Sequence, residues 1–445
     1  MSRLRGGESV SSIEKSPMSR SLSIDPPSFR SVLGAATLPR TVWSTPGETT
    51  VVGSGAAAVL SADGPDRFET IRERAATLFS DISADTECEA ARPRLFGGFA
   101  FHDDHTPTAP WTGFPGAKFV LPRIQVTWGD EHAWLTVNAM DSSRRAINDR
   151  LDEAKRWLSS LSDPGSLPDP PGITDHERTT NRDEWRTAVN ASIDRIHAGE
   201  LRKVVLAQAL RTTLAEDLSV PEPLARLWRT YPDCFGFLID STDEGRCFFG
   251  ATPERLVSLR GRTVETGALA GTTGRGDTPA EDEWLARELL SSEKDNHEHA
   301  IVVGAIREQL DPFSTTISTD KRRIRRLATV QHLETPISAE LAEDGHVLSL
   351  VEALHPTPAV GGLPPDRALS TICETEPFDR GWYAAPVGWF DAEGNGTFAV
   401  ALRSAVTTRD VATLFAGVGI VADSDPDREW DEVQLKYRPV LNALE

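Results

Sequence analysis

The sequence predicts an α+β protein in which strands make up much of the chain. Residues 202–210 alternate with a period of two, and residues 248–257 read as two strands joined by a Gly/Pro turn. Residues 181–199 instead repeat apolar side chains at helical spacing, from a capping Asn181 to a terminating Gly199. Because both periods occur in one chain, we expect strands and helices together.

Four regions follow one another along the chain. Residues 1–27 are rich in Ser, Arg and Pro without periodicity, which predicts a disordered arm. Residues 28–162 mix short apolar runs with one helical stretch and are expected to form an N-terminal subdomain. A Pro-rich loop or linker is expected over residues 163–178. The sharper patterns lie in residues 179–445, where we expect the functional site.

The charge balance excludes several classes of partner. There are 67 Asp and Glu residues against 47 Lys and Arg, so the formal net charge is -20. Nucleic acid and anionic membranes both reward positive surface, so neither is an expected partner. The excess of acid, with Arg preferred over Lys, is typical of proteins from salt-loving organisms. No run approaches the roughly 18 apolar residues of a membrane helix, and we expect a cytoplasmic protein.

Lys203 is the first candidate for chemistry. The period of two places it on one face with Val205, Ala207 and Ala209. Desolvation among small apolar residues disfavours the ammonium and moves a lysine toward the neutral amine that acts as a base. The alternative is a lysine at a strand end that reaches solvent.

Glu254 is the second candidate. It follows a Pro turn between two expected strands, where a partly buried carboxyl has the raised pKa that a general acid requires. The alternative is a solvated turn residue. Downstream, the Gly-rich segment 269–276 suits close approach to an anionic ligand, but it lacks the Lys-Ser/Thr ending of a phosphate-binding loop.

Carboxylates gather in two later segments. Residues 279–311 read as one long helix that carries Asp295 and Glu298 on one face. Paired carboxylates suit Mg²⁺, although a solvated acidic face is the alternative. The helix after Asp425 places Glu429 and Glu432 on one stripe, which indicates a lined cavity.

Two expected strands lie just before that last helix. In residues 397–407, Arg403 is expected to share a face with alanines, an arrangement suited to a carboxylate ligand. In residues 411–421, Gly417 leaves room for a ligand against the backbone. Lys436 extends the stripe of the following helix and adds a positive charge.

Taken in order, eight motifs resemble those of the chorismate-utilising enzymes, and most of all the isochorismate synthases. They are residues 203–207, 250–254, 269–272, 292–299, 330–333, 355–359, 376–380 and 429–432. The resemblance implies an α+β fold like that of anthranilate synthase component I, with two packed antiparallel sheets and outer helices. It also implies that residues 179–445 form the chorismate-binding catalytic region.

The resemblance further implies a role for each candidate. Lys203 would be the base that activates water for attack at C2 of chorismate, and Glu254 the acid that protonates the departing C4 hydroxyl. Mg²⁺ would be held by four carboxylates: Glu298 and Glu432, with Asp295 and Glu429 as outer ligands. The residues expected to bind the substrate are Gly271, Thr272, His332, Tyr383, Arg403, Gly417 and Lys436.

The expected activity is therefore that of an isomerase, an isochorismate synthase serving menaquinone synthesis, with siderophore synthesis as the other pathway. Anthranilate and aminodeoxychorismate synthases, which use ammonia, lack a lysine at position 203, so no glutamine amidotransferase subunit is expected. Salicylate synthases keep this lysine and remain an alternative, as does a catalytically silent relative. One departure from the family is Gln208, which stands where an arginine is usual.

Overall fold

The computed structural model describes residues 16–86, 88–241 and 245–445 of the chain. Its strands are β1 (Ser16–Ile24), β2 (Arg40–Ser44), β3 (Thr50–Ala62), β4 (Ser83–Asp85), β5 (Leu95–Phe99), β6 (Ala117–Trp128), β7 (Ala133–Ser142), β8 (Ile173–Arg178), β9 (Lys203–Leu214), β10 (Phe235–Asp240), β11 (Arg246–Thr252), β12 (Arg255–Arg260), β13 (Thr263–Gly274), β14 (Ser314–Thr319), β15 (Arg323–Arg326), β16 (Val330–Leu341), β17 (Gly362–Leu363), β18 (Pro386–Phe390), β19 (Gly396–Val400), β20 (Ser404–Thr408) and β21 (Val411–Ile420). Its α-helices are α1 (Phe29–Ala35), α2 (Arg67–Asp81), α3 (Arg144–Ser159), α4 (Arg182–His197), α5 (Pro221–Thr230), α6 (Pro279–Ser291), α7 (Glu293–Leu310), α8 (Val347–Leu354), α9 (Pro365–Thr375) and α10 (Pro426–Leu444). The expected α+β class is confirmed.

The strands form two antiparallel ladders that share β6. One ladder runs from β6 through β3, β2, β10, β11, β20 and β21 to β9. The other runs from β6 through β5, β18, β19, β12 and β13 to β16. Phe119 on β6 packs at this branch, with its ring centroid 5.2 Å from those of Phe99 and Phe390. The ladders diverge from this aromatic core, so their far ends present two facing sets of strands.

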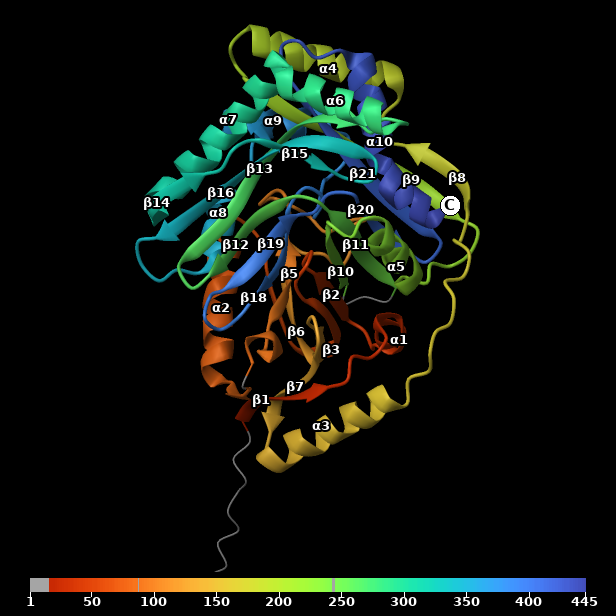
Figure 1. Cartoon of the computed structure of the whole chain (residues 1–445), viewed down its shortest axis with the longest axis vertical. Coiled ribbons are helices and arrows are strands. Elements are labelled where there is room, and N and C mark those ends of the chain that lie inside the picture. Colours follow the sequence, from red (N-terminus) through yellow and green to blue (C-terminus); the bar gives the residue numbers. More distant parts are fainter. Residues whose placement is uncertain (1–15, 87, 242–244) are drawn as a thin grey trace, which may run out of the picture.

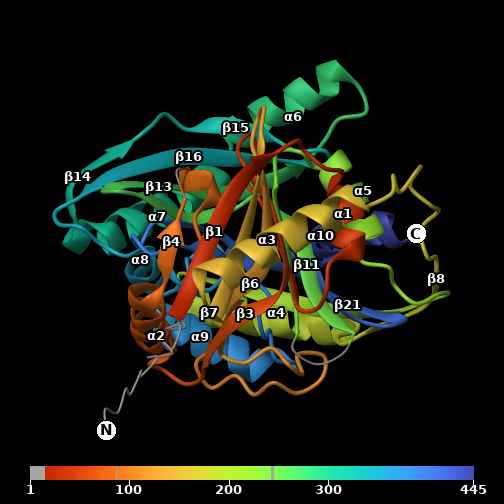
Figure 2. The ribbon, with the colours of Figure 1, turned by 90° about the horizontal axis from the view of Figure 1, so that it is seen from below.

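Helices cover the outside of both ladders (Figure 1). α6 and α7 pack on β13, α9 packs on β9, and α10 packs on β21, so these four helices surround the far ends of the ladders. α3 crosses β1 and β7 at the opposite end of the molecule, as the view from below also shows (Figure 2). None of the helices in the described residues is long and apolar enough to cross a membrane.

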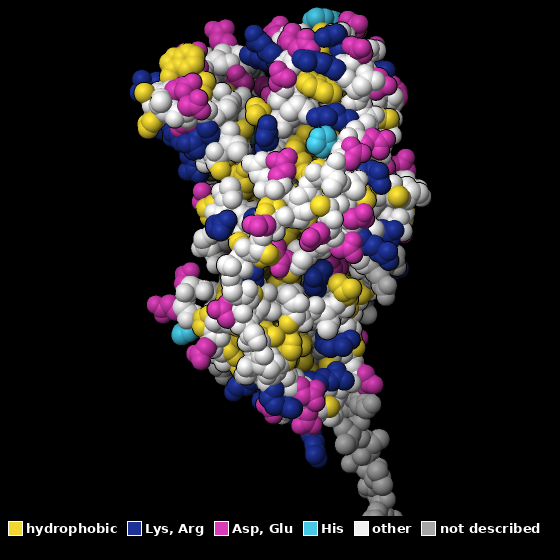
Figure 3. Space-filling view, turned by 90° about the vertical axis from the view of Figure 1, so that its right-hand side faces the viewer, with side chains coloured by type: hydrophobic (Ala, Val, Ile, Leu, Met, Phe, Trp, Pro, Cys, Tyr) yellow, Lys and Arg dark blue, Asp and Glu magenta, His cyan; other side chains and the backbone are white. Residues whose placement is uncertain are grey.

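Charged side chains of both signs are interspersed on the face drawn in Figure 3. Many of the arginines there and elsewhere pair with carboxylates, as Arg182 and Arg186 do with Asp427. On this face the acidic side chains are thus mixed with basic ones and form no large patch of a single sign.

Several expected boundaries are corrected. Residues 16–24 form β1, paired with β7, so the expectation of a disordered arm over residues 1–27 is wrong for this stretch; residues 1–15 lie outside the described residues. Within the expected linker 163–178, residues 173–178 form β8, paired with β9. The division of the chain into two regions at this linker stays a prediction.

Two expected elements are interrupted. The helix expected over residues 279–311 breaks at Ser292, whose hydroxyl caps α7 by accepting a hydrogen bond from the Asp295 amide at 3.2 Å. The strand expected over residues 397–407 is broken between β19 and β20, where Arg403 has a φ of 49°. The expectation that Arg403 shares a strand face with the neighbouring alanines is therefore wrong.

Candidate active site

A cavity of about 440 Å³ lies where the far ends of the two ladders face each other. The first ladder contributes β9 and β21, and the second contributes β13 and β16. α7 and α10 close the remaining sides. Every candidate residue from the sequence lines this cavity: Lys203, Glu254, Gly271, Thr272, Asp295, Glu298, His332, Tyr383, Arg403, Gly417, Glu429, Glu432 and Lys436.

Two of these residues lie where the chain crosses between the ladders. Glu254 is in the connection from β11 to β12, and Arg403 is in the connection from β19 to β20. The crossings are held side by side, because the Val400 amide donates to the Glu254 carbonyl at 3.0 Å and the Ala251 amide to the Arg403 carbonyl at 3.3 Å. A carboxyl and a guanidinium are thus fixed by backbone geometry at the seam of the fold.

Lys203 begins β9 and is almost fully buried, with 2% of its side chain exposed. Its Nζ donates a 2.6 Å hydrogen bond to Glu298 Oε1 on α7. This ammonium lowers the pKa of Glu298 against the opposing effect of burial. On β21, the strand paired with β9, a Cβ at Gly419 would lie 2.8 Å from Lys203 Cε, so glycine there lets the lysine side chain keep this position.

Burial raises the pKa of Glu254 to about 7, and the charges of Lys203 and Lys436 oppose that rise. Its carboxyl is therefore a weak acid that holds a proton near neutral pH. This is the state that a proton donor needs before reaction, as the sequence interpretation required.

Arg403, His332 and Thr272 form a chain of hydrogen bonds along one wall. Arg403 Nη2 donates to His332 Nε2 at 3.2 Å, and His332 Nδ1 lies 3.0 Å from the Thr272 hydroxyl. Burial and the neighbouring guanidinium hold the pKa of His332 well below its usual value. The imidazole is thus neutral, and since Nε2 accepts, Nδ1 carries the proton toward Thr272. Arg403 Nη1 is buried with no oxygen or nitrogen partner among the described residues, and the guanidinium also interacts with the Cys234 thiol. A buried guanidinium nitrogen that lacks an oxygen partner suits an anionic ligand.

The four acidic candidates come from two helices. α7 carries Asp295 and Glu298, and α10 carries Glu429 and Glu432. Burial and the nearby charge of Glu432 raise the pKa of Glu429 to about 7, as expected of carboxyls that share a site. Lys436 Nζ lies 2.9 Å from Glu432 Oε1 and donates to the Gly417 carbonyl at 2.8 Å.

This donor set fits Mg²⁺, which takes oxygen ligands. Within the described part of the chain, no cluster of three or more His, Cys, Asp or Glu side chains is already arranged around a metal position. Mg²⁺ is usually held by one or two carboxylates, with water and an anionic substrate completing its shell. The repulsion between Glu429 and Glu432 contributes to the raised pKa of Glu429, and a bound cation would relieve this repulsion.

Three other candidates also line the cavity. Tyr383 stacks on Phe415 of β21 with ring centroids 5.3 Å apart, and burial raises the pKa of its hydroxyl. A Cβ at Gly417 would lie 3.2 Å from the Tyr383 hydroxyl oxygen. Gly271 has a φ of 79°, which favours glycine, and it lies against Asp295.

Residues without an assigned role also line the cavity. Arg380 is buried and pairs with Glu376, with Nε donating to Oε2 at 2.8 Å. It also donates to the Val205 carbonyl at 2.8 Å, while Glu376 accepts from the Ala207 amide at 2.8 Å. The spacing of four residues between Glu376 and Arg380 was a visible sign of this pair. Lys294 lines the cavity as well.

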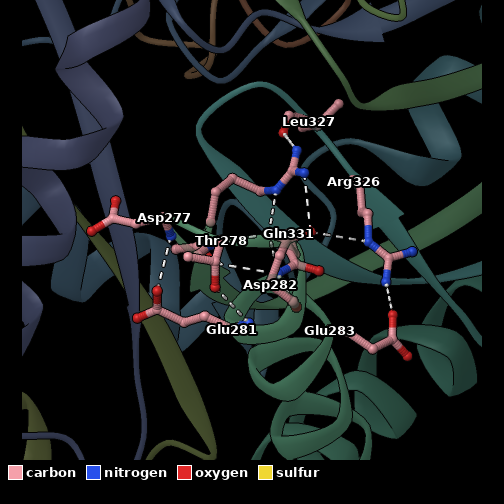
Figure 4. A network of polar contacts seen from close by, with 11 residues as sticks. Asp277, Thr278, Glu281, Asp282, Glu283, Arg326, Leu327 and Gln331 are labelled. Carbon is pink, nitrogen blue, oxygen red and sulfur yellow. Dashed lines mark hydrogen bonds and ion pairs between the residues drawn. The ribbon is translucent and has the colours of Figure 1, made fainter.

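A polar network fastens the start of α6 to the strands beside it (Figure 4). Asp282 accepts hydrogen bonds from Arg275 Nε at 2.6 Å and from Gln331 Nε2 at 3.1 Å, and Arg326 Nε lies 3.4 Å from it. Gln331 belongs to β16, so the network ties α6 to the second ladder. The network thereby holds the connection from β13 to α6 against β16.

Comparison with known proteins agrees with this architecture. The family model of chorismate binding enzymes matches residues 11–445. The isochorismate synthase MenF of Bacillus subtilis is 35% identical over 416 residues, covering 91% of this chain and 88% of that protein. The salicylate biosynthesis isochorismate synthase of Pseudomonas aeruginosa is 38% identical over 431 residues, covering 95% and 89%.

Solved structures are similar in fold. MenF of Escherichia coli, a menaquinone-specific isochorismate synthase, aligns with a TM-score of 0.81 at 27% identity over 98% of this chain and 97% of that one. Anthranilate synthase component I of Streptococcus pneumoniae aligns with a TM-score of 0.76 at 22% identity over 89% and 93%, which confirms the expected fold. The chain belongs to the chorismate binding enzyme family.

Proposed function

We propose that the protein is an isochorismate synthase that converts chorismate to isochorismate with Mg²⁺. The observation that carries this proposal is the presence of Lys203 and Glu254 on one cavity that is also lined by the Arg403 guanidinium and four carboxylates. The relatives named isochorismate synthase support the same activity.

The proposed reaction divides two proton transfers between two groups. Lys203, which donates to Glu298 as an ammonium, first gives up that proton to solvent. The oxygen of a water molecule then bonds to C2 of the ring while the neutral Lys203 amine accepts the water proton. The ring double bonds shift, and the C4–O bond breaks as Glu254 gives its proton to the hydroxyl, which leaves as water. An amine and a protonated carboxyl suit these opposite tasks.

The other lining residues would hold the dianionic substrate. The Nη1 of Arg403 and the ammonium of Lys436 offer positive charge to its carboxylates, and Tyr383 offers a hydroxyl. Glu298 and Glu432, with Asp295 and Glu429 outside them, would hold Mg²⁺. When bound, the ion supplies positive charge that fixes a substrate carboxylate and offsets the surrounding acids.

Lys203 favours water over ammonia as the nucleophile, because the family's ammonia-using members lack this lysine. The alternative activity is that of a salicylate synthase, which forms salicylate by also eliminating pyruvate. The relatives include proteins named for menaquinone and for salicylate biosynthesis, so both pathways are open, and we favour the menaquinone pathway.

The test is direct. Purified protein is incubated with chorismate and Mg²⁺, and the products are separated by chromatography. Isochorismate as the main product supports the proposal. Salicylate with pyruvate would transfer the assignment to salicylate synthase, and absence of turnover would indicate a silent relative.

A further inference from the structure

Glu254 lines a second cavity besides the one that holds the candidate active site. This second cavity has a volume of about 190 Å³ and shares Pro253, Glu254 and Leu269 with the first. Its other walls come from β13, β15 and β16, together with Pro46 and Phe235. Glu254 thus lines both cavities.

The far wall of the second cavity is charged and reaches solvent. Arg325 Nη1 and Arg323 Nε lie 3.1 and 2.7 Å from the carboxylate oxygens of Glu334. The Arg325 side chain is 22% exposed, whereas that of Arg323 is 64% exposed. A space lined by such groups is polar enough to hold water and opens at the Arg323 rim.

After the proposed reaction Glu254 is deprotonated, and the second cavity offers a path by which it can regain a proton. Each turnover moves one proton from Glu254 to the departing C4 hydroxyl and leaves one proton from the attacking water on Lys203. Before the next turnover Lys203 must therefore release a proton to solvent, and the Glu254 carboxylate must regain one from solvent. While the ring occupies the first cavity, that side of the carboxyl is covered by ligand. Meanwhile the positive charge of Arg325 stabilises the carboxylate that remains.

We propose that the second cavity is the proton-return route of the general acid: water in it carries a proton from solvent at the Arg323 rim to the Glu254 carboxylate. The inference rests on the proposed function. Arg325 and Glu334 act here as positioning residues, because their ion pair keeps the cavity open and polar without touching the substrate.

Gly267 offers a way to fill this cavity without altering the catalytic groups. It lies on β13, on the strand face shared with Leu269, and a Cβ there would lie 3.2 Å from the Thr335 carbonyl oxygen and 3.7 Å from Pro336 Cα. Valine suits a strand, and its side chain would add bulk at a residue that lines the cavity. The Gly267→Val variant is therefore the test, Gly267→Ala is a smaller change in case valine impairs folding, and Ser318→Val on the exposed strand β14 is the control.

Rapid-quench kinetics at pH 6 with saturating Mg²⁺ separates the route from the chemistry, because Glu254 begins protonated. For Gly267→Val we expect a first turnover at the wild-type rate, a burst of about one product per site, and then a steady rate lower by about tenfold. Gly267→Ala should show a smaller loss, and raising the concentration of a small weak acid such as acetic acid at constant pH should restore the steady rate. Ser318→Val should behave as the wild type.

Two results would overturn the proposal. In folded Gly267→Val protein, an unchanged steady rate would mean that protons return through the first cavity after product release. A first turnover slowed as much as later ones would mean that the substitution disturbs the chemical step. Failure of the wild type itself to form isochorismate would refute the proposed function, and this outcome is distinct from both.

Discussion

Replacing Glu254 by Gln should raise the stability of the protein while removing activity. The folded-state pKa of about 7 is raised from the ordinary 4.5, so the folded protein binds this proton more tightly than the unfolded chain does. The contribution of the Glu254 proton to the free energy of unfolding is therefore fully present below pH 4.5 and is lost as the pH rises through 7. The difference of about 2.5 pKa units corresponds to about 3 kcal/mol at pH 8, and to less than about 1 kcal/mol at pH 5.

Glutamine keeps the shape of the side chain without its charge, so the variant escapes this loss. Calorimetry at pH 5 and pH 8 would measure the difference, and for a chain of this length about 3 kcal/mol corresponds to a melting temperature higher by about 3 °C. Glu200→Gln, at an exposed position, is the matched control. Its melting temperature should differ from that of the wild type by the same small amount at pH 5 and at pH 8. Isochorismate formation by Glu254→Gln should fall by about 10²- to 10⁴-fold, as for loss of a general acid. A variant no more stable than the wild type at pH 8 would show that this carboxyl bears no penalty for ionising.

Four further substitutions test other parts of the site. Lys203→Met should abolish isochorismate formation, since it removes the base and leaves the Glu298 carboxylate without its ammonium; product assays with full activity would contradict the mechanism. Glu298→Gln should raise the Mg²⁺ concentration needed for half-maximal activity, measured by titrating metal into chelator-treated protein. Glu376→Gln should destabilise the fold by about 3 kcal/mol in denaturant unfolding, because it leaves the buried Arg380 without its charge partner. Asp282→Asn should raise the KM for chorismate in steady-state assays, because it weakens the ion pair with Arg275 at the start of α6. An unchanged KM would show that the α6 network does not position the site.

The candidate residues were predictable because short motifs carry them. Taken alone, Lys203 could have been a solvent-exposed lysine at a strand end and Glu254 a solvated turn residue. The ordered motifs around them favoured a functional site. Their meeting in one cavity was not predictable from spacing, because it depends on pairing between strands far apart in the chain. β9 pairs with β21 in an antiparallel register that sets Val205 opposite Gly419, across more than 200 residues.

Local detail was missed where a side chain overrides a periodic pattern. Apolar spacing continues through residues 279–311, yet the hydroxyl of Ser292 competes for backbone amides and starts a new helix. The pattern Ser292-x-x-Asp295 was the available signal. At Arg403 the alternation of alanines suggested a continuous strand, but the chain there crosses to the other ladder with a positive φ that no alternation pattern encodes.

The absence of a side chain at Gly419 makes the protein unusually sensitive to single mutations at that position. A library of random variants selected for loss of function should return many substitutions at position 419, including alanine, although the residue has no functional group. A methyl there would meet Lys203 Cε at 2.8 Å and Glu298 Oε1 at 3.1 Å, and so displace both. Such variants would stay folded and be inactive, which makes this codon a sensitive marker for telling active members of a sequence collection from inactive ones.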